Sequence, residues 1–427
     1  MQTSTKKLNI VHISTSELKP AVYNPRTIDP ASMEQLKESI NRFGLVDPII
    51  LNSAPKRKNI VIGGHQRIKA AEELGITEIP AVYISIPNEA KEKELNLRLN
   101  RNTGQWDFEK LKSFDLEFLL DVGFDDVDLS NIWDDTLATE EDDFDVEKEL
   151  EQIKKPKTKP GNIFQLGSHR LICGNSGDAE VIKKLVGNSY VDMVYTDPPF
   201  NISLDYNKGI GGKGKYGGVH TNDSRSDADY REFLKVTMQN ALKVSKLSCH
   251  MFYFCDEKYI GMVQGLYEEI GLQNKRVCLW LKNNQNPTPQ IAFNKVYEPC
   301  VYATRGTPYL NNKVLNLNEV MNKEVGSGNR LIDDVMDLFN IWLVKRLPGK
   351  DYQHPTEKSP TLHEKAIRRC TKPGDLILDI FGGSGSTLIA AEQLKRRCYV
   401  VEMEPIFCDL IIKRYETLTN HKAKKLN

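Results

Sequence analysis

The stretch 376-LILDIFGGSGS-386 combines an apolar strand with a glycine turn that opens a helix. Gly383 and Gly385 allow the backbone to turn tightly and to approach a ligand closely. The first acidic residue after the next predicted strand is Glu402, 17 residues beyond Gly385. An acid near this distance can accept hydrogen bonds from a ribose. The pattern therefore favours a nucleoside ligand at the carboxyl end of this strand.

Two other glycine motifs do not fit this stretch. A dinucleotide fingerprint needs a third glycine where this chain has Leu388, and the GK[ST] signature of a P-loop is missing. The remaining alternative is a purely structural turn between a strand and a helix.

Strands and helices alternate on both sides of this stretch. Strands are predicted at residues 170–173, 191–195, 250–254, 276–281, 297–303, 376–380 and 398–401, and helices at 229–242, 256–270, 361–370, 386–395 and 405–417. This alternation predicts a doubly wound, mostly parallel, Rossmann-like α/β sheet that helices cover on both faces.

A second motif follows the predicted strand at residues 191–195. The loop Thr196-Asp197-Pro198-Pro199-Phe200 lies at the carboxyl end of that strand, where open α/β sheets bind their ligands. Two prolines stiffen the loop and remove two N–H donors, so the Asp197 carboxylate and the Pro198 carbonyl can act as acceptors for an exocyclic amine. Phe200 offers a ring for stacking on a base. A structural turn is again the alternative.

Together, DPPF and FGGSG resemble the amino-methyltransferases that methylate adenine N6 or cytosine N4 in DNA. The order of the motifs, catalytic first and cofactor second, is similar to the beta class of that family. Residues 170–176, 280–284, 297–299 and 354–360 resemble further segments of it, so the resemblance covers roughly residues 160–419.

The resemblance implies S-adenosylmethionine as cofactor and double-stranded DNA as partner, with the target base flipped out of the helix. Asn175 stands where the family usually has an aspartate facing the adenine of the cofactor, and an amide can still donate or accept there. The candidate catalytic residues are Asp197, Pro198, Pro199 and Phe200; the candidate cofactor-binding residues are Asn175, Asp379, Phe381, Gly383, Ser384, Gly385 and Glu402. A loop over residues 207–218 is expected to close over the flipped base, or to be a plain surface loop, and residues 305–353 are expected to recognise the DNA sequence.

Residues 8–86 resemble a different family, the ParB/sulfiredoxin-like domain, which with trailing helices is expected to span residues 1–135. The resemblance rests on residues 24–26, 45–49 and the segment Gly63-Gly64-His65-Gln66-Arg67, within a small mixed α/β unit. Nucleotide-binding members of that family hold phosphates with the corresponding segment, so a nucleotide on this domain is left open. The first cysteine of the chain is Cys173, which argues against sulfiredoxin chemistry.

Bulk composition sets the remaining expectations. The chain has 427 residues and balanced charge, with 58 Lys+Arg and 58 Asp+Glu, so net charge does not reveal a nucleic-acid partner. Residues 136–159, acidic and then basic, predict a solvated interdomain linker, and residues 421–427 predict a tail.

Scattered cysteines predict reduced thiols and no metal site. Neither a signal peptide nor a membrane-length apolar stretch is visible, which predicts a cytoplasmic, nucleoid-associated protein without a membrane partner. A homodimer is left open.

The sequence thus favours a site-specific adenine-N6 DNA methyltransferase of the restriction–modification type. Asp197 carries the choice of adenine, because cytosine-N4 enzymes more often have serine at this position of the motif. The alternatives are cytosine-N4 methylation, or a ParB-like DNA clamp with an inactive methyltransferase domain.

Overall fold

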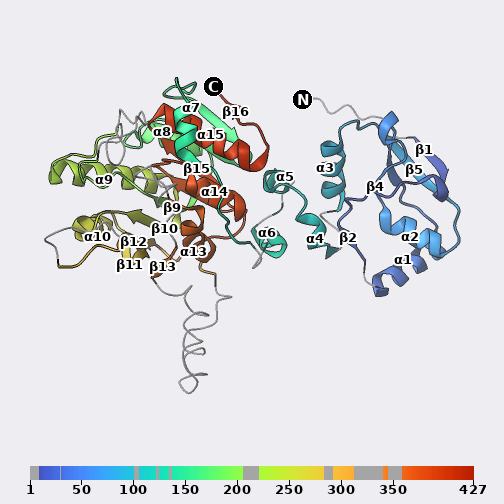
Figure 1. The fold of residues 1–427 in the computed structure, drawn as a ribbon. Helices are drawn as coiled ribbons and strands as arrows, with labels where there is room; N and C mark the ends of the chain where they lie inside the picture. Colours follow the sequence, from blue (N-terminus) through green and yellow to red (C-terminus); the bar gives the residue numbers. More distant parts are fainter. Residues whose placement is uncertain are drawn as a thin grey trace, which may run out of the picture. The chain divides into compact units, whose positions relative to one another are not determined.

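The computed structural model describes residues 9–28, 30–100, 105–121, 124, 126–133, 137–204, 221–282, 292–311, 340–344 and 358–427. The chain divides into two compact units, Met1–Ile132 and Trp133–Asn427 (Figure 1). The loop predicted at residues 207–218 and most of the segment predicted at 305–353 lie outside the described residues.

The smaller unit is a mixed α/β fold around a sheet in the order β1-β5-β3-β4. Its core comes from strand residues such as Ile49, Leu51 and Ile79, packed on Ile68 and Ala71 of one helix. The elements are β1 (Ile10–Ser14), β2 (Arg26–Thr27), α1 (Pro30–Phe43), β3 (Ile49–Asn52), β4 (Val61–Gly63), α2 (His65–Glu73), β5 (Glu78–Ile84), α3 (Glu89–Asn100), β6 (Gln105–Trp106), α4 (Phe108–Leu111), α5 (Leu116–Asp121) and α6 (Asp126–Trp133).

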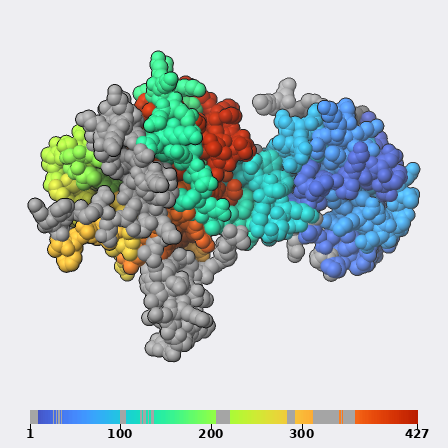
Figure 2. Space-filling view, viewed as in Figure 1, coloured from blue at the N-terminus to red at the C-terminus, as the bar shows by residue number. Residues whose placement is uncertain are grey.

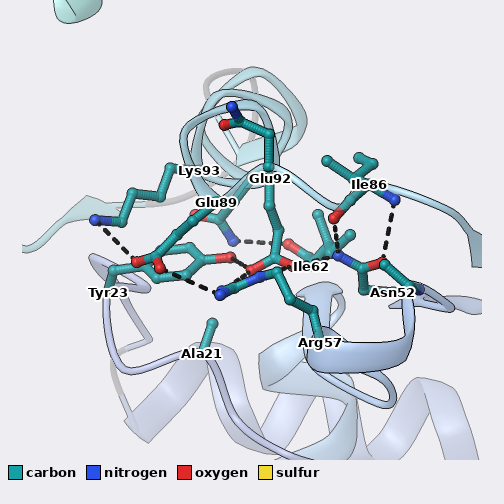
Figure 3. Close-up of polar contacts among 12 residues, drawn as sticks. Ala21, Tyr23, Asn52, Arg57, Ile62, Ile86, Glu89, Glu92 and Lys93 are labelled. Carbon is teal, nitrogen blue, oxygen red and sulfur yellow. Dashed lines mark hydrogen bonds and ion pairs between the residues drawn. The ribbon is translucent and has the colours of Figure 1, made fainter.

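A buried carboxylate fastens α3 to this sheet. Figure 3 shows Tyr23, Asn52 and Arg57 converging on Glu92. Donor–acceptor distances to its carboxylate are 2.6 Å from Tyr23 Oη, 2.5 Å from Asn52 Nδ2 and 2.7 Å from Arg57 Nη2. Burial alone would raise the pKa of Glu92, but these donors hold it below its usual value.

The larger unit contains, among its described residues, a ten-stranded sheet in the order β13-β11-β12-β10-β9-β14-β15-β8-β7-β16. The neighbours β10, β9, β14, β15 and β8 run parallel, whereas β12 on one side and β7 on the other pair antiparallel. The strands are β7 (Ile163–Leu166), β8 (His169–Cys173), β9 (Val191–Thr196), β10 (Ser245–Phe254), β11 (Gln273–Leu281), β12 (Tyr297–Arg305), β13 (Ile341–Leu343), β14 (Leu376–Asp379), β15 (Arg397–Glu402) and β16 (Lys424–Lys425). The doubly wound, Rossmann-like prediction is confirmed, with antiparallel margins that it did not include.

Helices cover both faces of this sheet, because successive strand residues point to opposite sides. Val194 of β9 packs with α8, α9 and α10, while its neighbours Met193 and Tyr195 pack with α13, α14 and α15. The helices are α8 (Ala179–Val186), α9 (Asp227–Lys243), α10 (Ile260–Glu269), α13 (Pro360–Cys370), α14 (Ser386–Gln393) and α15 (Pro405–Thr419).

Residues 137–159 do not form the solvated connector that their composition predicts. Helix α7 (Val146–Gln152) places Val146 and Leu150 one turn apart, and both are buried against Phe407 and Leu410 of α15. Polar groups of this segment also bind to α15. Asp142 pairs with Arg414, and the Thr158 N–H donates to Asp409. Figure 2 shows the green segment lying against the red C-terminal helices. We call residues 137–159 the strap.

The predicted tail is likewise structured. Strand β16 pairs antiparallel with β7, and the Leu426 N–H donates to the Ile163 carbonyl at 2.8 Å. Backbone pairing of this kind needs no apolar side chains, which explains why composition did not reveal it.

Candidate active site

The two sequence motifs meet at the carboxyl ends of adjacent parallel strands. Ile377 and Leu378 of β14 are in register with Met193 and Val194 of β9. The loop Asp197–Phe200 therefore leaves the sheet beside the loop Ile380–Gly385. This edge of the sheet is where open α/β folds bind ligands.

The glycine loop is shaped by close packing on the neighbouring strand and helix. A Cβ on Gly382 would lie 2.4 Å from Val400, and one on Gly385 would lie 3.0 Å from Ile411. Gly383 and Gly385 have φ values of 52° and 82°, in the left-handed region that favours glycine. Gly383 and Gly385, the two glycines singled out in the sequence, are both favoured by their backbone conformation. A third glycine, Gly382, is required because a side chain would collide with Val400.

Glu402 ends β15 and supports this loop. Its carboxylate accepts the N–H of Gly383 at 2.8 Å and that of Glu404 at 2.7 Å. Burial raises the pKa of Glu402 to about 7, and it raises the pKa of Asp379 to about 7 as well. Both carboxyl groups therefore keep a proton to higher pH than exposed carboxyl groups do.

A cavity of about 310 Å³ lies between these loops. Its polar lining comes from both motifs, and its apolar wall includes Phe233, whose ring centroid is 5.7 Å from that of Phe381. Among the predicted site residues, Asn175, Asp197, Pro199, Asp379, Phe381, Gly383, Ser384 and Glu402 line the cavity, whereas Pro198, Phe200 and Gly385 do not.

Asp197 lies in the cavity wall with its two oxygens in different situations. Its Oδ2 pairs with Lys358 Nζ, while its Oδ1 is buried and has no hydrogen-bond partner among the described atoms. Burial raises the pKa of Asp197, and Lys358 opposes that rise. Buried acceptors without a partner are rare in folded proteins, so Asp197 Oδ1 marks a position where a ligand can donate a hydrogen bond.

Phe200 and Pro199 are held in place by neighbouring side chains. Tyr230 donates its hydroxyl to the Pro199 carbonyl at 2.8 Å, and Lys358 Nζ lies 5.5 Å from the centre of the Phe200 ring. Asn175 accepts the Gly177 N–H at 2.8 Å through Oδ1, so part of its amide already shapes the turn after β8.

Several cavity residues were missed by sequence reasoning. Lys358 and His363 come from the start of α13, and His363 bridges Tyr195 Oη at 3.1 Å and Ser386 Oγ at 2.8 Å. Arg225 lies 4.2 Å from the centre of the Phe233 ring. Burial lowers the pKa of His363 to about 3, so this side chain is neutral. Lys358 lies within residues 354–360, which resemble a segment of the family, but that resemblance did not assign the lysine a role in the site.

In the smaller unit, the segment Gly63–Arg67 forms the end of β4 and the start of α2, with Gly64 at φ 96°. His65 Nε2 accepts the Ala21 N–H at 3.4 Å, and burial lowers its pKa to about 4. Arg67 pairs with Asp47, at 2.5 Å between Nη1 and Oδ2. These side chains are thus engaged within the unit.

Other classes of site find little support in the described part of the chain. No group of three or more His, Cys, Asp or Glu residues is arranged to hold a metal there, and all eight cysteines of the chain are buried and outside disulfides. No helix among the described residues is long and apolar enough to cross a membrane.

The sheet and its two loops define an α/β protein with a ligand-sized cavity at the carboxyl ends of its parallel strands. Residues 191–413, more than half of the chain, match the family model described as DNA methylase, which comprises the N6/N4 methyltransferases. The chain belongs to this DNA methylase family. Residues 1–102 match the model described as the ParB N-terminal domain.

Individual proteins resemble the chain over the same region. The type II methyltransferase M2.DpnII of Streptococcus pneumoniae is 28% identical over 285 residues, which cover 62% of this chain and 98% of that protein. The M1.HpyAVI–SAM complex is 21% identical, with a TM-score of 0.39, covering 57% of this chain and 97% of the other. The cytosine-N4-specific PvuII DNA methyltransferase is 16% identical, with a TM-score of 0.38, covering 63% and 98%.

Proposed function

We propose that this DNA methyltransferase transfers a methyl group from S-adenosylmethionine to the exocyclic N6 of adenine in double-stranded DNA after base flipping. The observation that carries the proposal is the buried, unpartnered Oδ1 of Asp197 in the wall of the cavity. An exocyclic amine supplies the N–H donor that this oxygen lacks.

The cavity residues fit S-adenosylmethionine. The volume of about 310 Å³ is at the lower end of the range for small-molecule sites. Glu402 has lone pairs left for ribose hydroxyls after accepting two backbone N–H groups, and Phe381 offers an apolar face. The residues proposed to hold the cofactor are Asn175, Asp379, Phe381, Gly383, Ser384, Gly385 and Glu402. When bound, S-adenosylmethionine supplies an electrophilic methyl group.

The protein contributes orientation and electrostatics. The Asp197 carboxylate and the Pro198 carbonyl accept the hydrogens of the target amine, which favours a more tetrahedral nitrogen whose lone pair is available. Pro199 keeps the loop stiff, and Phe200 stacks on the flipped base. No covalent intermediate with the enzyme is required.

Adenine is preferred to cytosine because the motif begins with Asp197. The test is to methylate unmodified DNA with isotopically labelled cofactor, digest it to nucleosides and separate the products. We expect N6-methyladenine. Recovery of N4-methylcytosine alone would refute the choice of base and leave the rest of the site assignment intact.

The rival proposal of a DNA clamp with an inactive methyltransferase domain makes a different prediction. Asp197→Ala should abolish methylation while leaving DNA affinity within a few-fold, because the carboxylate acts on the amine and not on the phosphates. Full activity in this variant would overturn the catalytic assignment.

Of the domain scheme 1–135, 136–159, 160–420 and 421–427, the proposed division of labour keeps the ParB-like and methyltransferase domains, and it joins the strap and the last seven residues to the methyltransferase domain, against which they pack. Residues 305–353 are proposed to read the DNA sequence, and the ParB-like domain to add DNA affinity or nucleotide dependence. Titration of the full chain with CTP, with and without DNA, tests the last point, and an absence of binding would remove nucleotide dependence from the scheme.

A further inference from the structure

A row of alternating charges runs behind the catalytic loop. Lys358 Nζ pairs with Asp197 Oδ2 and lies 3.4 Å from Glu298 Oε2, and Glu298 pairs in turn with Lys282. The residues of this row come from three places: the loop after β9, the residues just before α13, and the antiparallel pair β11 and β12. In that pair, Trp280 is opposite Glu298. The Lys358 side chain is only 7% exposed.

Aromatic rings enclose the ammonium group of Lys358. Its Nζ lies 4.9 Å from the centre of the Phe254 ring, 5.5 Å from that of Phe200 and 5.9 Å from that of Trp280. Such rings attract a cation and replace the water it loses. The backbone is fixed too, because Ser359 caps α13 by accepting the Thr361 N–H at 3.1 Å.

This enclosure decides which state Asp197 adopts. A desolvated carboxyl group tends to keep its proton, and a protonated oxygen would be a donor where an acceptor is needed. A cation fixed on Oδ2 opposes protonation and leaves Oδ1 as an acceptor. Glu298, with carboxylate oxygens near both Lys358 and Lys282, fixes the position of that cation.

We propose that Lys358, held in place by Glu298, is a positioning residue that keeps Asp197 ionised and its Oδ1 available to the target amine. The inference rests on the proposed function, since it assigns Asp197 the role of acceptor. It adds two residues to the site, neither of which contacts the amine.

The other groups near Asp197 set the background of its titration. Lys358 and Lys282 favour the ionised form, and Glu298 disfavours it. Among the described residues, the titratable groups around it are Lys358, Glu298, Lys282, Asp379, Tyr195, Tyr230, Cys255 and Cys300. Removing the Lys358 charge should therefore move the protonation of Asp197 to higher pH.

The first experiment measures single-turnover methylation from pH 5.5 to 9 in the full chain. We expect Lys358→Met to lower the rate at pH 7 at least a hundredfold and to move the acid limb of the profile up by one pH unit or more. Lys358→Arg should return the acid limb most of the way to its wild-type pH. Glu298→Gln should move the limb less than Lys358→Met, because the loss of a fixed partner for Lys358 and the loss of a negative charge near Asp197 act in opposite directions. DNA and cofactor dissociation constants should stay within about threefold. Lys295→Met removes a lysine that pairs with Asp256 at 2.6 Å away from this row, and should match the wild type.

The second experiment reads the carboxyl group directly and does not depend on turnover. Carboxyl-13C-labelled aspartate is followed by NMR against pH, with Asp197→Asn to assign the signal. In Lys358→Met, Asp197 should titrate at least one unit higher than in the wild type. Equal titration in the two proteins would overturn the inference, even if the wild type methylates DNA. A wild type that does not methylate DNA but shows the shift would refute the proposed function and leave the charge relationship standing.

Discussion

Thr196 Oγ1 donates a hydrogen bond to Asp379 Oδ1 at 2.8 Å, across the boundary between the two motifs. The same hydroxyl oxygen accepts the Ile380 N–H at 3.2 Å. Residues 183 positions apart in the chain are thereby locked at the point where β9 and β14 end. One buried hydroxyl thus ties the catalytic loop to the cofactor loop, in addition to the pairing of β9 with β14.

Thr196→Val should loosen this junction while keeping its volume. Asp379 would lose a donor in a buried position, which costs roughly 1.5–3 kcal/mol when the carboxylate is charged. Because burial raises the pKa of Asp379 to about 7, the loss of stability should be larger at pH 8 than at pH 6. Urea unfolding at both pH values checks this. Thr196→Ser keeps the hydroxyl and should stay near the wild type; equal losses in both variants would show that the methyl group, not the bond, matters.

Glu402 should make the stability of the protein depend on pH. Burial raises its pKa to about 7, so the stability tied to its protonated form is present at low pH and is lost as pH rises through 7. Without cofactor, Glu402→Gln removes this pH dependence but places an NH2 group against one of the two backbone N–H donors, so it should be less stable than the wild type at pH 6, by about 1–3 kcal/mol, and closer to it at pH 8. It should also bind S-adenosylmethionine at least tenfold more weakly by calorimetry.

Glu392 provides the matched control of opposite sign. Burial would raise its pKa, but its bond to His169 at 2.7 Å holds it down to about 2. Its stabilising contribution is present above the unfolded value and is lost only as pH falls toward 2. Glu392→Gln should thus destabilise the protein at pH 8 without changing cofactor affinity. If the stability deficit of Glu402→Gln were the same at pH 6 and pH 8, burial would not be the dominant influence on Glu402.

The strands that carry the site were predictable because their residues are apolar in short runs with clear ends. The strand expected at 376–380 is β14 at Leu376–Asp379, and the strand expected at 191–195 is β9 at Val191–Thr196. The antiparallel margins were not predictable, because strand direction depends on connections that no local pattern encodes. The pair Asp197–Lys358 was hidden for the same reason, since its members are 161 positions apart.

The strap was misjudged because its many charged residues indicate a segment that prefers water. Charge composition cannot reveal that Asp142 has a buried partner in Arg414, or that Val146 and Leu150 share one face of a helix against α15. A highly charged segment has the same composition whether its side chains face water or form ion pairs with a neighbouring helix.

The carboxylate of Glu92 should be the main polar fastener of the smaller unit. Glu92→Gln keeps the size of the side chain but removes the charge that Arg57 and Tyr23 contact, at a cost of about 2–3 kcal/mol. Hydrogen exchange of the amides in α3 would report the loss locally. Glu89→Gln is the control, because Glu89 contacts the same arginine at 3.2 Å from an exposed position and should change stability by less than about 1 kcal/mol. Equal effects would mean that burial of Glu92 adds nothing.

Asp142 should connect the strap to cofactor binding. Arg414 is 2% exposed; it holds Asp142 at 2.5 Å from Nε and 2.8 Å from Nη2, and its Nη1 donates to the Ser384 carbonyl at 3.1 Å. Asp142→Asn leaves a buried guanidinium without its counter-ion, which costs about 3–5 kcal/mol and frees the glycine loop at Ser384. Asp143→Asn, which changes the adjacent exposed residue, is the matched control. We expect the first variant to lower the melting temperature and to weaken S-adenosylmethionine binding at least fivefold, and the second to do neither. A stability loss in Asp142→Asn with unchanged cofactor affinity, measured below the melting transition, would limit the strap to a structural role and break the link through Arg414.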